Sequence, residues 1–354
     1  MSAGPPGARV GREAFRELVA YQTDRDSCDI DLSDNTSLFG APPAALRVLR
    51  GLDGDDVTRY PGLCARELRR ALAAYAEVQP SEIVTGCGSD DVIDSTIRAV
   101  AEPGEAIAFP DPTFSMIPVF ACVNGLRPIP VPIGREHDLD FDAMLATDAR
   151  IIYLCSPNNP TGVVASREGI ERVLEHARGI VILDEASAEF AGTGLTASAP
   201  AHGRLVVTRT LSKAFGLAGL RLGYATAAAP LVVEIEKARG PYTTNGPGER
   251  AALAALTEDL PWVRARTAEA VAIRERLAEA LRARGLEPLP SGANFLLVPI
   301  EAAAGVADRM RERGVAVRAF RHVAGVGDAI RISVGPWTVM TRMLAVLDEA
   351  RRCA

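Results

Sequence analysis

The sequence has little that would commit the protein to disulfide bonds, to a metal site or to nucleic acid. Among its 354 residues are 6 cysteines and 4 histidines. The cysteines include no CxxC pair and no two histidines lie three or four residues apart, so we expect neither a disulfide framework nor a zinc site. Lys+Arg number 39 against 45 Asp+Glu, a net charge of −6 with no basic stretch. We therefore expect no metal and no nucleic-acid partner.

Long hydrophobic runs are also absent. The apolar stretches at residues 151–155 and 180–183 are far shorter than the roughly 18 residues of a membrane span. Residues 1–20 contain no apolar signal core. We expect a cytoplasmic protein with no membrane partner, and the length of 354 residues predicts two domains.

Short apolar runs alternate with amphipathic stretches along the middle of the chain. The apolar runs predict buried strands at residues 106–109, 127–131, 150–155, 180–183, 205–209 and 222–226. The amphipathic stretches predict helices at residues 90–100, 114–123, 167–178 and 231–239. This alternation favours an α/β fold, with a mainly parallel sheet between helices.

The C-terminal part has a different pattern, which predicts a smaller α+β domain. A charged amphipathic helix at residues 261–284 precedes predicted strands at 293–299, 315–318 and 329–334 and a terminal helix. We predict a large domain at residues 41–250, and a second unit formed by residues 251–354 with the N-terminal arm, residues 1–40. The Gly- and Pro-rich residues 240–248 would join the two. The arm should pack on one of the domains or on a second subunit.

Polar residues follow several predicted strands, at the ends where open α/β sheets bind ligands. SPNNPTG occupies residues 156–162, Asp184 and Glu185 follow the next strand, and Lys213 lies in RTLSKAFG, residues 209–216. Each alone has a simpler interpretation, as a structural turn, a helix cap or a surface lysine. Their combination in this order favours a shared site.

Lys213 is one of only two lysines in the chain, and small, hydroxylated and apolar residues surround it in sequence. Burial would lower the pKa of its amine, which suits Schiff-base chemistry with a carbonyl. If the carbonyl belongs to pyridoxal phosphate, Asp184 would pair with the ring nitrogen and Asn159 would donate to the phenolic oxygen. The phosphate needs hydroxyls, a guanidinium or a helix N-terminus. The candidates are Thr210, Ser212, Arg221, Gly88, Ser89 and Asp90.

These motifs resemble those of the fold-type-I pyridoxal-phosphate-dependent aminotransferases, and within them the histidinol-phosphate aminotransferase group. The resemblance rests on SPNNPTG, on DEA at residues 184–186 and on RTLSKAFGLAGLRLGY at residues 209–224. Further matches are RYP at 59–61, TGCGS at 85–89, DPTF at 111–114, SGANF at 291–295, VR at 317–318 and RISVG at 331–335. The similarity spans about residues 20–345.

The resemblance implies a role for several residues. Lys213 would hold the cofactor covalently and then move a proton between the substrate α-carbon and the cofactor's C4′. Tyr60 would contact the cofactor phosphate of the neighbouring subunit, which implies a homodimer with shared active sites. Phe114 would stack on the cofactor ring. Arg331, with Arg318 nearby, would bind the substrate anion, either an amino-acid carboxylate or the phosphate of a phosphorylated amino alcohol.

Ser187 departs from the family's pattern, which usually has a tyrosine at this position that donates to the cofactor's phenolic oxygen. Serine is too short to make that contact directly. The resemblance therefore implies a higher pKa for the cofactor-bound lysine nitrogen and an altered rate or reaction outcome. Asn159 would be the main donor to the phenolic oxygen.

A second departure lies in the arm, where residues 35–38 read NTSL and the family commonly reads NENP. In this family the arm lines the substrate side of the pocket. The resemblance therefore implies that the substrate side of this pocket differs from that of the usual family member. Asn35, Asn294 and Tyr21 are the further residues that we expect to line the substrate pocket.

The favoured function is an aminotransferase that moves an amino group between histidinol phosphate or an aromatic amino acid and a 2-oxo acid such as 2-oxoglutarate. An alternative with the same cofactor is a decarboxylase related to threonine-phosphate decarboxylase, or a specialised metabolic enzyme acting at another carbon. The residues that follow Lys213, AFGLAG, resemble the aminotransferases more closely. A non-catalytic sensor module would carry a DNA-binding domain, which we do not expect in a stretch as short as residues 1–20.

Overall fold

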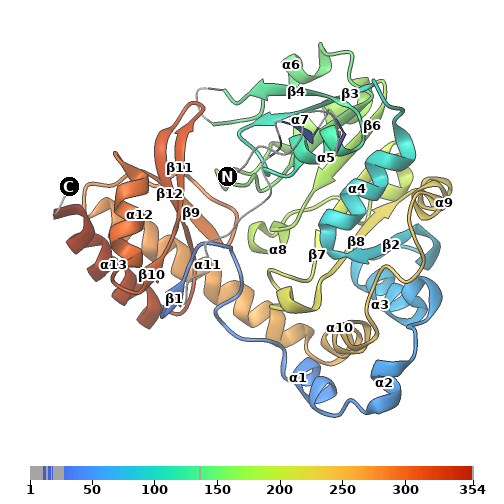
Figure 1. Cartoon of the computed structure of the whole chain (residues 1–354), viewed down its shortest axis with the longest axis horizontal. Coiled ribbons are helices and arrows are strands. Elements are labelled where there is room, and N and C mark those ends of the chain that lie inside the picture. The colour runs from blue at the N-terminus through green and yellow to red at the C-terminus, as the bar shows by residue number, and fades with distance from the viewer. Residues whose placement is uncertain (1–10, 13–14, 17, 19–27, 135–136, 353–354) are drawn as a thin grey trace, which may run out of the picture.

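A seven-stranded sheet forms the centre of the larger part of the molecule (Figure 1). The computed structural model describes residues 11–12, 15–16, 18, 28–134 and 137–352. The strand order is β2-β8-β7-β6-β5-β3-β4, and β8 alone in this sheet runs antiparallel to its neighbours. The strands are β2 (Ile83–Cys87), β3 (Ala106–Asp111), β4 (Arg127–Pro132), β5 (Ile151–Cys155), β6 (Ile180–Asp184), β7 (Leu205–Thr210) and β8 (Leu222–Ala227). The prediction of a mainly parallel sheet is confirmed.

Helices cover both faces of this sheet, because successive strand residues bury apolar side chains on opposite sides. In β5, Ile151, Tyr153 and Cys155 join the core under α4, α5 and α9, whereas Ile152 and Leu154 join the core under α6 and α7. These helices are α4 (Gly88–Val100), α5 (Ile117–Val123), α9 (Ala229–Lys237), α6 (Phe141–Leu145) and α7 (Arg167–His176). Tyr153 therefore faces the same side of the sheet as α4.

Several elements are not predicted by the sequence pattern. Strand β2 reads IVTGC, in which Thr85 and Gly86 interrupt the apolar run. Helix α10 (Gly246–Glu258) begins inside the predicted junction, because the side chain of Asn245 caps the amide of Gly248 and a proline occupies the first turn. The other unpredicted α-helices are α1 (Pro43–Arg50), α2 (Gly54–Thr58), α3 (Arg66–Ala76), α6, α8 (Ala188–Ala191) and α12 (Ala303–Arg311).

A second, three-stranded antiparallel sheet lies in the C-terminal part, in the order β11-β12-β9. Its elements are β9 (Phe295–Pro299), β11 (Arg318–Val323) and β12 (Gly327–Ser333), with helices α11 (Leu260–Arg282), α12 (Ala303–Arg311) and α13 (Trp337–Arg352). The predicted strand at residues 315–318 is in fact two elements. Its first half, β10 (Val315–Ala316), pairs in parallel with β1 (Ile30–Asp31) of the arm. The arm therefore packs on this part of the chain.

Helix α11 connects the two parts (Figure 1). Val263 and Ala270 in its first half share a core with α3 and α10, whereas Leu277 and Leu281 belong to the C-terminal core. The division at residues 41–250 and 251–354 stays a prediction, although α10 packs with the larger part. None of the helices in the described ranges has both the length and the apolar character needed to cross a membrane.

Candidate active site

Most of the predicted site residues meet at one edge of the large sheet, where the parallel strands end. Asp184 ends β6, Thr210 ends β7, and α4 begins directly after β2. Because β8 is antiparallel to β7, its first residue lies at this same edge, and Arg221 directly precedes it. The strand order thus gathers residues that are far apart in the sequence.

Lys213 lies in the turn after β7. Its Nζ donates a hydrogen bond to the backbone oxygen of Asp34, at 2.9 Å, so the arm covers the amine. Burial of the amine, helped by the positive charge of Arg331, lowers the pKa of Lys213 to about 8. A substantial fraction of the amine is then neutral near physiological pH and available as a nucleophile or base.

Asp184 is buried, and both of its carboxylate oxygens accept hydrogen bonds. Oδ2 accepts from the hydroxyl of Tyr153 at 2.8 Å, and Oδ1 accepts from the amide of Ala186 at 3.0 Å and the hydroxyl of Thr208 at 3.4 Å. Burial raises the pKa of Asp184 to about 6, and the hydrogen bond from Tyr153 is the main opposing influence. The sequence analysis does not single out Tyr153, although a tyrosine within an apolar strand signals a buried hydroxyl that needs a partner.

The N-terminus of α4 approaches β8 very closely. A Cβ atom added at Gly223 would lie 2.2 Å from the backbone nitrogen of Ser89, so only glycine fits there. Arg221 donates to Asp90 Oδ2 at 3.1 Å and thus lies beside the first turn of α4. The first turn of a helix has free amide groups and a positive dipole, which together with a guanidinium suit an anion.

Two hydroxyls complete this cluster. The side chains of Thr210 and Ser212 are buried, and their oxygens lie 2.9 Å apart. Thr210 also accepts a hydrogen bond from the amide of Ser212 at 3.1 Å. Thr210 is the last residue of β7, and Ser212 directly precedes Lys213 in the turn that follows.

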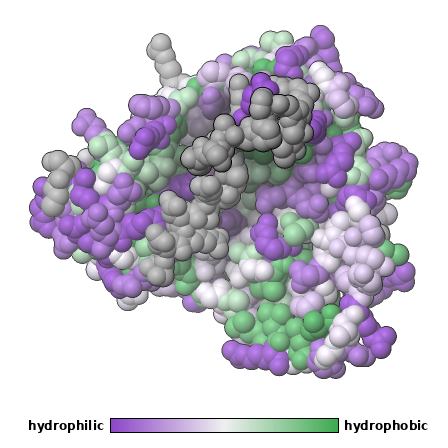
Figure 2. Space-filling view, viewed as in Figure 1, coloured by the Kyte–Doolittle hydropathy of each residue, from purple (hydrophilic) through white to green (hydrophobic). Residues whose placement is uncertain are grey.

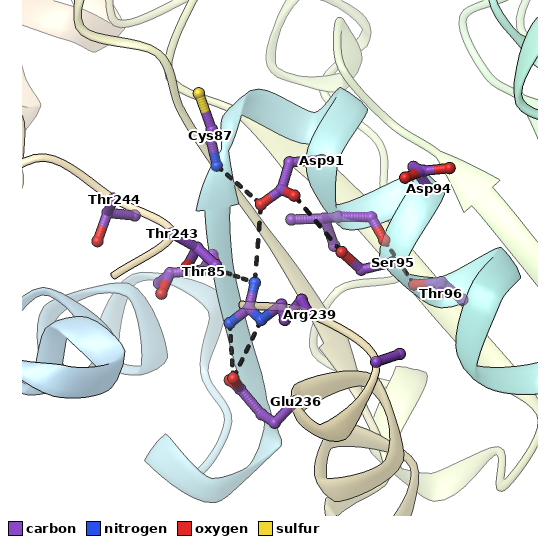
Figure 3. A network of polar contacts seen from close by, with 12 residues as sticks. Thr85, Cys87, Asp91, Asp94, Ser95, Thr96, Glu236, Arg239, Thr243 and Thr244 are labelled. Carbon is purple, nitrogen blue, oxygen red and sulfur yellow. Dashed lines mark hydrogen bonds and ion pairs between the residues drawn. The ribbon is translucent and has the colours of Figure 1, made fainter. Parts of the chain in front are cut away.

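A partly buried polar network beside β2 and the start of α4 supports this arrangement (Figure 3). The side chain of Arg239 is 3% exposed, donates to the backbone oxygen of Thr85 and forms an ion pair with Glu236 at 2.8 Å. It also lies 3.9 Å from Asp91 Oδ2, which accepts from the amide of Cys87 at 3.1 Å. These contacts hold the junction between β2 and α4 in place. The sequence analysis misses Arg239, because an arginine at the end of a predicted helix carries no chemical signal.

Arg331 lies on β12 of the small sheet and is 8% exposed. Its guanidinium donates to Asn159 Oδ1 and, at 2.6 Å, to the backbone oxygen of Ser33. The rings of Phe295 and Phe320 flank it at 5.4 and 5.6 Å. A residue predicted for the substrate therefore contacts a residue predicted for the cofactor.

Arg318, Asn35 and Asn294, which are also predicted for the substrate, lie near Arg331. Arg318 is its direct partner across the β11–β12 ladder. Asn294 donates to the backbone oxygen of Asn35 at 2.9 Å, and its own Oδ1 is buried with no hydrogen-bond partner among the described residues. A buried acceptor in that state is available to a donor from a water or from a bound molecule. Tyr21 lies outside the described residues.

The turn after β5 is tied to the segment after β3. The hydroxyl of Thr113 donates to Asn158 Oδ1 at 2.8 Å, and Asn158 Nδ2 donates to the backbone oxygen of Pro112 at 3.0 Å. Phe114 directly follows Thr113, is partly buried and packs against the core under α4. Ser187 is buried at the start of α8, and its side chain makes no capping hydrogen bond there.

Tyr60 does not join the residues around Lys213. It is 81% exposed and stacks on Tyr242, with ring centroids 4.6 Å apart. Tyr60 borders a hollow of about 390 Å³ that is also lined by Asp56 and Arg250. The small cavity next to Lys213 is instead lined by residues of the arm, α8 and α11.

Comparison with known proteins decides the family. The class I and II aminotransferase family matches residues 28–347. The chain belongs to this family. A histidinol-phosphate aminotransferase of Roseiflexus castenholzii is 38% identical over 353 residues, covering 96% of this chain and 94% of that protein. An aromatic amino acid aminotransferase of Corynebacterium glutamicum is 35% identical over 298 residues, covering 82% and 85%.

The fold of this chain is similar to that of a solved aminotransferase structure. The histidinol-phosphate aminotransferase from Sinorhizobium meliloti, in complex with pyridoxal-5'-phosphate, superposes with a TM-score of 0.86 at 26% identity, covering 99% of this chain and all of that one. The predicted fold class is confirmed. The predicted resemblance to fold-type-I pyridoxal-phosphate-dependent aminotransferases of the histidinol-phosphate aminotransferase group is confirmed as well.

Proposed function

We propose that this aminotransferase uses pyridoxal phosphate to move an amino group between histidinol phosphate or an aromatic amino acid and a 2-oxo acid such as 2-oxoglutarate. The observation that carries the proposal is the enclosed amine of Lys213, with a pKa lowered to about 8, at the sheet edge where Asp184 is buried. The names of the relatives support the two classes of amino donor.

The residues at this edge fit the four functional groups of pyridoxal phosphate. Lys213 would bind the aldehyde and Asp184 the ring nitrogen. Asn159 would donate from Nδ2 to the phenolic oxygen, because its Oδ1 already accepts from Arg331. Phe114, which directly follows Thr113, would stack on the ring. The phosphate would be bound by the first turn of α4 and the neighbouring side chains, which are Ser89, Asp90, Thr210, Ser212 and Arg221.

The positions of these side chains explain how the chain would serve the reaction. Bound pyridoxal phosphate supplies an electron sink for the carbanion formed at the substrate α-carbon. Lys213 Nζ, partly neutral near pH 8, would accept the proton from that carbon and would deliver it to C4′ of the cofactor. Asp184 holds a negative charge in a buried place, which favours a protonated ring nitrogen. The backbone of the arm at Ser33 and Asp34 covers Arg331 and Lys213 and limits the access of water.

The substrate anion would bind Arg331. Arg318 adds a second positive charge across the ladder, and Asn294 Oδ1 offers an acceptor to a substrate donor. Asn35 and Tyr21 of the arm would line the same pocket. A planar guanidinium binds a carboxylate or a phosphate equally well, so both donor classes fit this side of the site.

We also propose that the enzyme works as a homodimer with shared active sites. Tyr60 is too exposed to serve the site of its own chain, and large apolar side chains of Val57 and Leu63 are 70% and 62% exposed next to it. Apolar side chains also gather over α1, at the lower edge of the view in Figure 2. A second subunit docked here would bury them and bring Tyr60 to the partner's cofactor phosphate. The cytoplasmic location stays a prediction.

A spectral half-reaction tests the proposed function. Holoenzyme is mixed with one amino donor and no 2-oxo acid, and the cofactor absorbance is followed. Histidinol phosphate or an aromatic amino acid should convert the cofactor to its amine form, and 2-oxoglutarate should reverse the change. No conversion by any donor, with release of CO₂ from an amino acid instead, would show the decarboxylase that Ser187 leaves as the alternative.

A further inference from the structure

Tyr153 is a buried hydroxyl that none of the roles above uses. It is fully buried at the centre of β5, in a strand whose other four residues are apolar. Its ring packs in the core under α4, and its hydroxyl donates to Asp184 Oδ2 at 2.8 Å. Burial and the negative charge of Asp184 raise the pKa of Tyr153 well above its usual value, so the hydroxyl remains a donor at every working pH.

Tyr153 is placed to control the carboxylate rather than only to fill the core. The register of β5 and β6 sets Cys155 opposite Asp184, and Tyr153 lies two residues earlier on the same face. From the other side, Ala186 and Thr208 donate to Oδ1. The carboxylate is thus held from two sides and cannot rotate freely.

We propose that Tyr153 is a positioning residue that orients Asp184 and keeps it ionised for the ring nitrogen of the cofactor. This inference rests on the proposed function, because it assigns the carboxylate to that nitrogen. Tyr153 itself touches neither cofactor nor substrate in this assignment. It acts through Asp184.

Because the groups around Asp184 act on its pKa in opposite directions, loss of the Tyr153 hydroxyl should change that pKa measurably. Asp90 of α4 acts on it with a like charge, and Cys155 of β5 is a thiol whose pKa burial raises, so it stays neutral. Burial and Asp90 both favour the protonated acid. The donors from Tyr153, Ala186 and Thr208 oppose them, and Tyr153 is the strongest of the three.

The test compares Tyr153→Phe with wild-type enzyme by the dissociation constant of pyridoxal phosphate between pH 5 and pH 9. Loss of one hydrogen bond to a buried carboxylate should raise the pKa of Asp184 by about one unit. The variant should therefore bind the cofactor up to about tenfold more weakly below pH 6 and almost equally above pH 8. The acidic limb of the kcat/KM profile should move to higher pH by the same unit.

Tyr224→Phe is the matched control, because Tyr224 is another fully buried tyrosine of the same sheet, on β8, and no contact of its hydroxyl with Asp184 is found. Its cofactor affinity should keep the wild-type pH dependence. A loss in Tyr153→Phe that is the same at every pH would show a structural role alone and overturn the proposal, as would no loss. Wild-type enzyme that binds no cofactor would overturn the proposed function itself, and the inference with it.

Two further measurements keep the test decisive. In an Asp184→Asn background, Tyr153→Phe should add no pH-dependent loss, and additive losses would show that the hydroxyl does not act through Asp184. If Tyr153→Phe does not fold, 3-fluorotyrosine at position 153 keeps the ring and provides a stronger donor. The acidic limb should then move to lower pH, and an unmoved limb would overturn the proposal.

Discussion

The guanidinium of Arg331 donates a hydrogen bond to Oδ1 of Asn159, and this bond joins the two sheets of the enzyme. Arg331 stands on β12 of the small sheet, whereas Asn159 follows β5 of the large one. The same positive charge helps to lower the pKa of Lys213. Arg331, a side chain of the C-terminal part, therefore acts on both Lys213 and Asn159, the amine and the amide that we assign to the cofactor.

Lys213→Ala should abolish the covalent adduct with pyridoxal phosphate that borohydride traps, and should lower kcat by at least about 10²-fold, because the proton carrier is lost. Lys237→Ala is the control. Lys237 is the other lysine of the chain and lies exposed in an ion pair with Glu234. Peptide mapping of the reduced holoenzyme should find the label at Lys213 alone, and a label at Lys237 would contradict the assignment.

The uptake of pyridoxal phosphate by the cofactor-free enzyme should follow the neutral fraction of Lys213. A base with a lowered pKa loses its proton early, so the uptake rate should rise with pH through about 8 and then level off. In Arg331→Met the midpoint should move to higher pH, by up to about one unit, because a positive charge beside the amine is removed. Stopped-flow absorbance measures both curves, and equal midpoints would show that Arg331 does not act on the amine.

Ser187→Tyr should lower the pH midpoint of the spectral change of the bound cofactor, because a phenolic hydroxyl would donate to the cofactor's phenolic oxygen. Ser187 makes no capping hydrogen bond at α8, so its replacement removes no local contact of that kind. Ser187→Phe supplies the ring without the hydroxyl and serves as the control. If both variants shift the midpoint equally, the hydroxyl is not responsible.

Arg239→Met should destabilise the fold by about 2 kcal/mol, because the backbone oxygen of Thr85 and the partly buried carboxylate of Asp91 lose this positive charge and Glu236 keeps only Arg69 as a partner. It should also weaken cofactor binding, since the network supports the first turn of α4. Denaturant unfolding and a cofactor titration measure the two effects. Arg167→Met, which removes an exposed pair with Glu171, should change either quantity much less. Similar losses in both variants would show that the network has no special role.

Much of the fold could be predicted from local pattern. The apolar runs of the large sheet are correct as strands, because strands buried on both faces are almost continuously apolar. Strand β2 and helix α10 could not be predicted, since the glycine in β2 and the glycines and proline at the start of α10 are normally signals of loops. The break at Val317 depends on pairing with the arm, which no local pattern reveals.

The candidate site could be predicted where a side chain of suitable chemistry follows a predicted strand, as Asp184 and Lys213 do. It was not predictable where contacts cross between strands or domains. The hydrogen bond from Tyr153 to Asp184 requires the register of β5 against β6. The contacts of Arg239 require three segments that meet only in the folded chain.

The sequence by itself determined the family of this enzyme, the kinds of functional group at its site and the strands that carry them. These follow from residue identity and from hydrophobic periodicity, which are local properties. Tertiary structure alone decided which groups meet, as when Lys213 donates to Asp34, 179 residues away in the chain. It also decided the burial that lowers the pKa of Lys213 and raises that of Asp184, because desolvation depends on every segment packed around a charge.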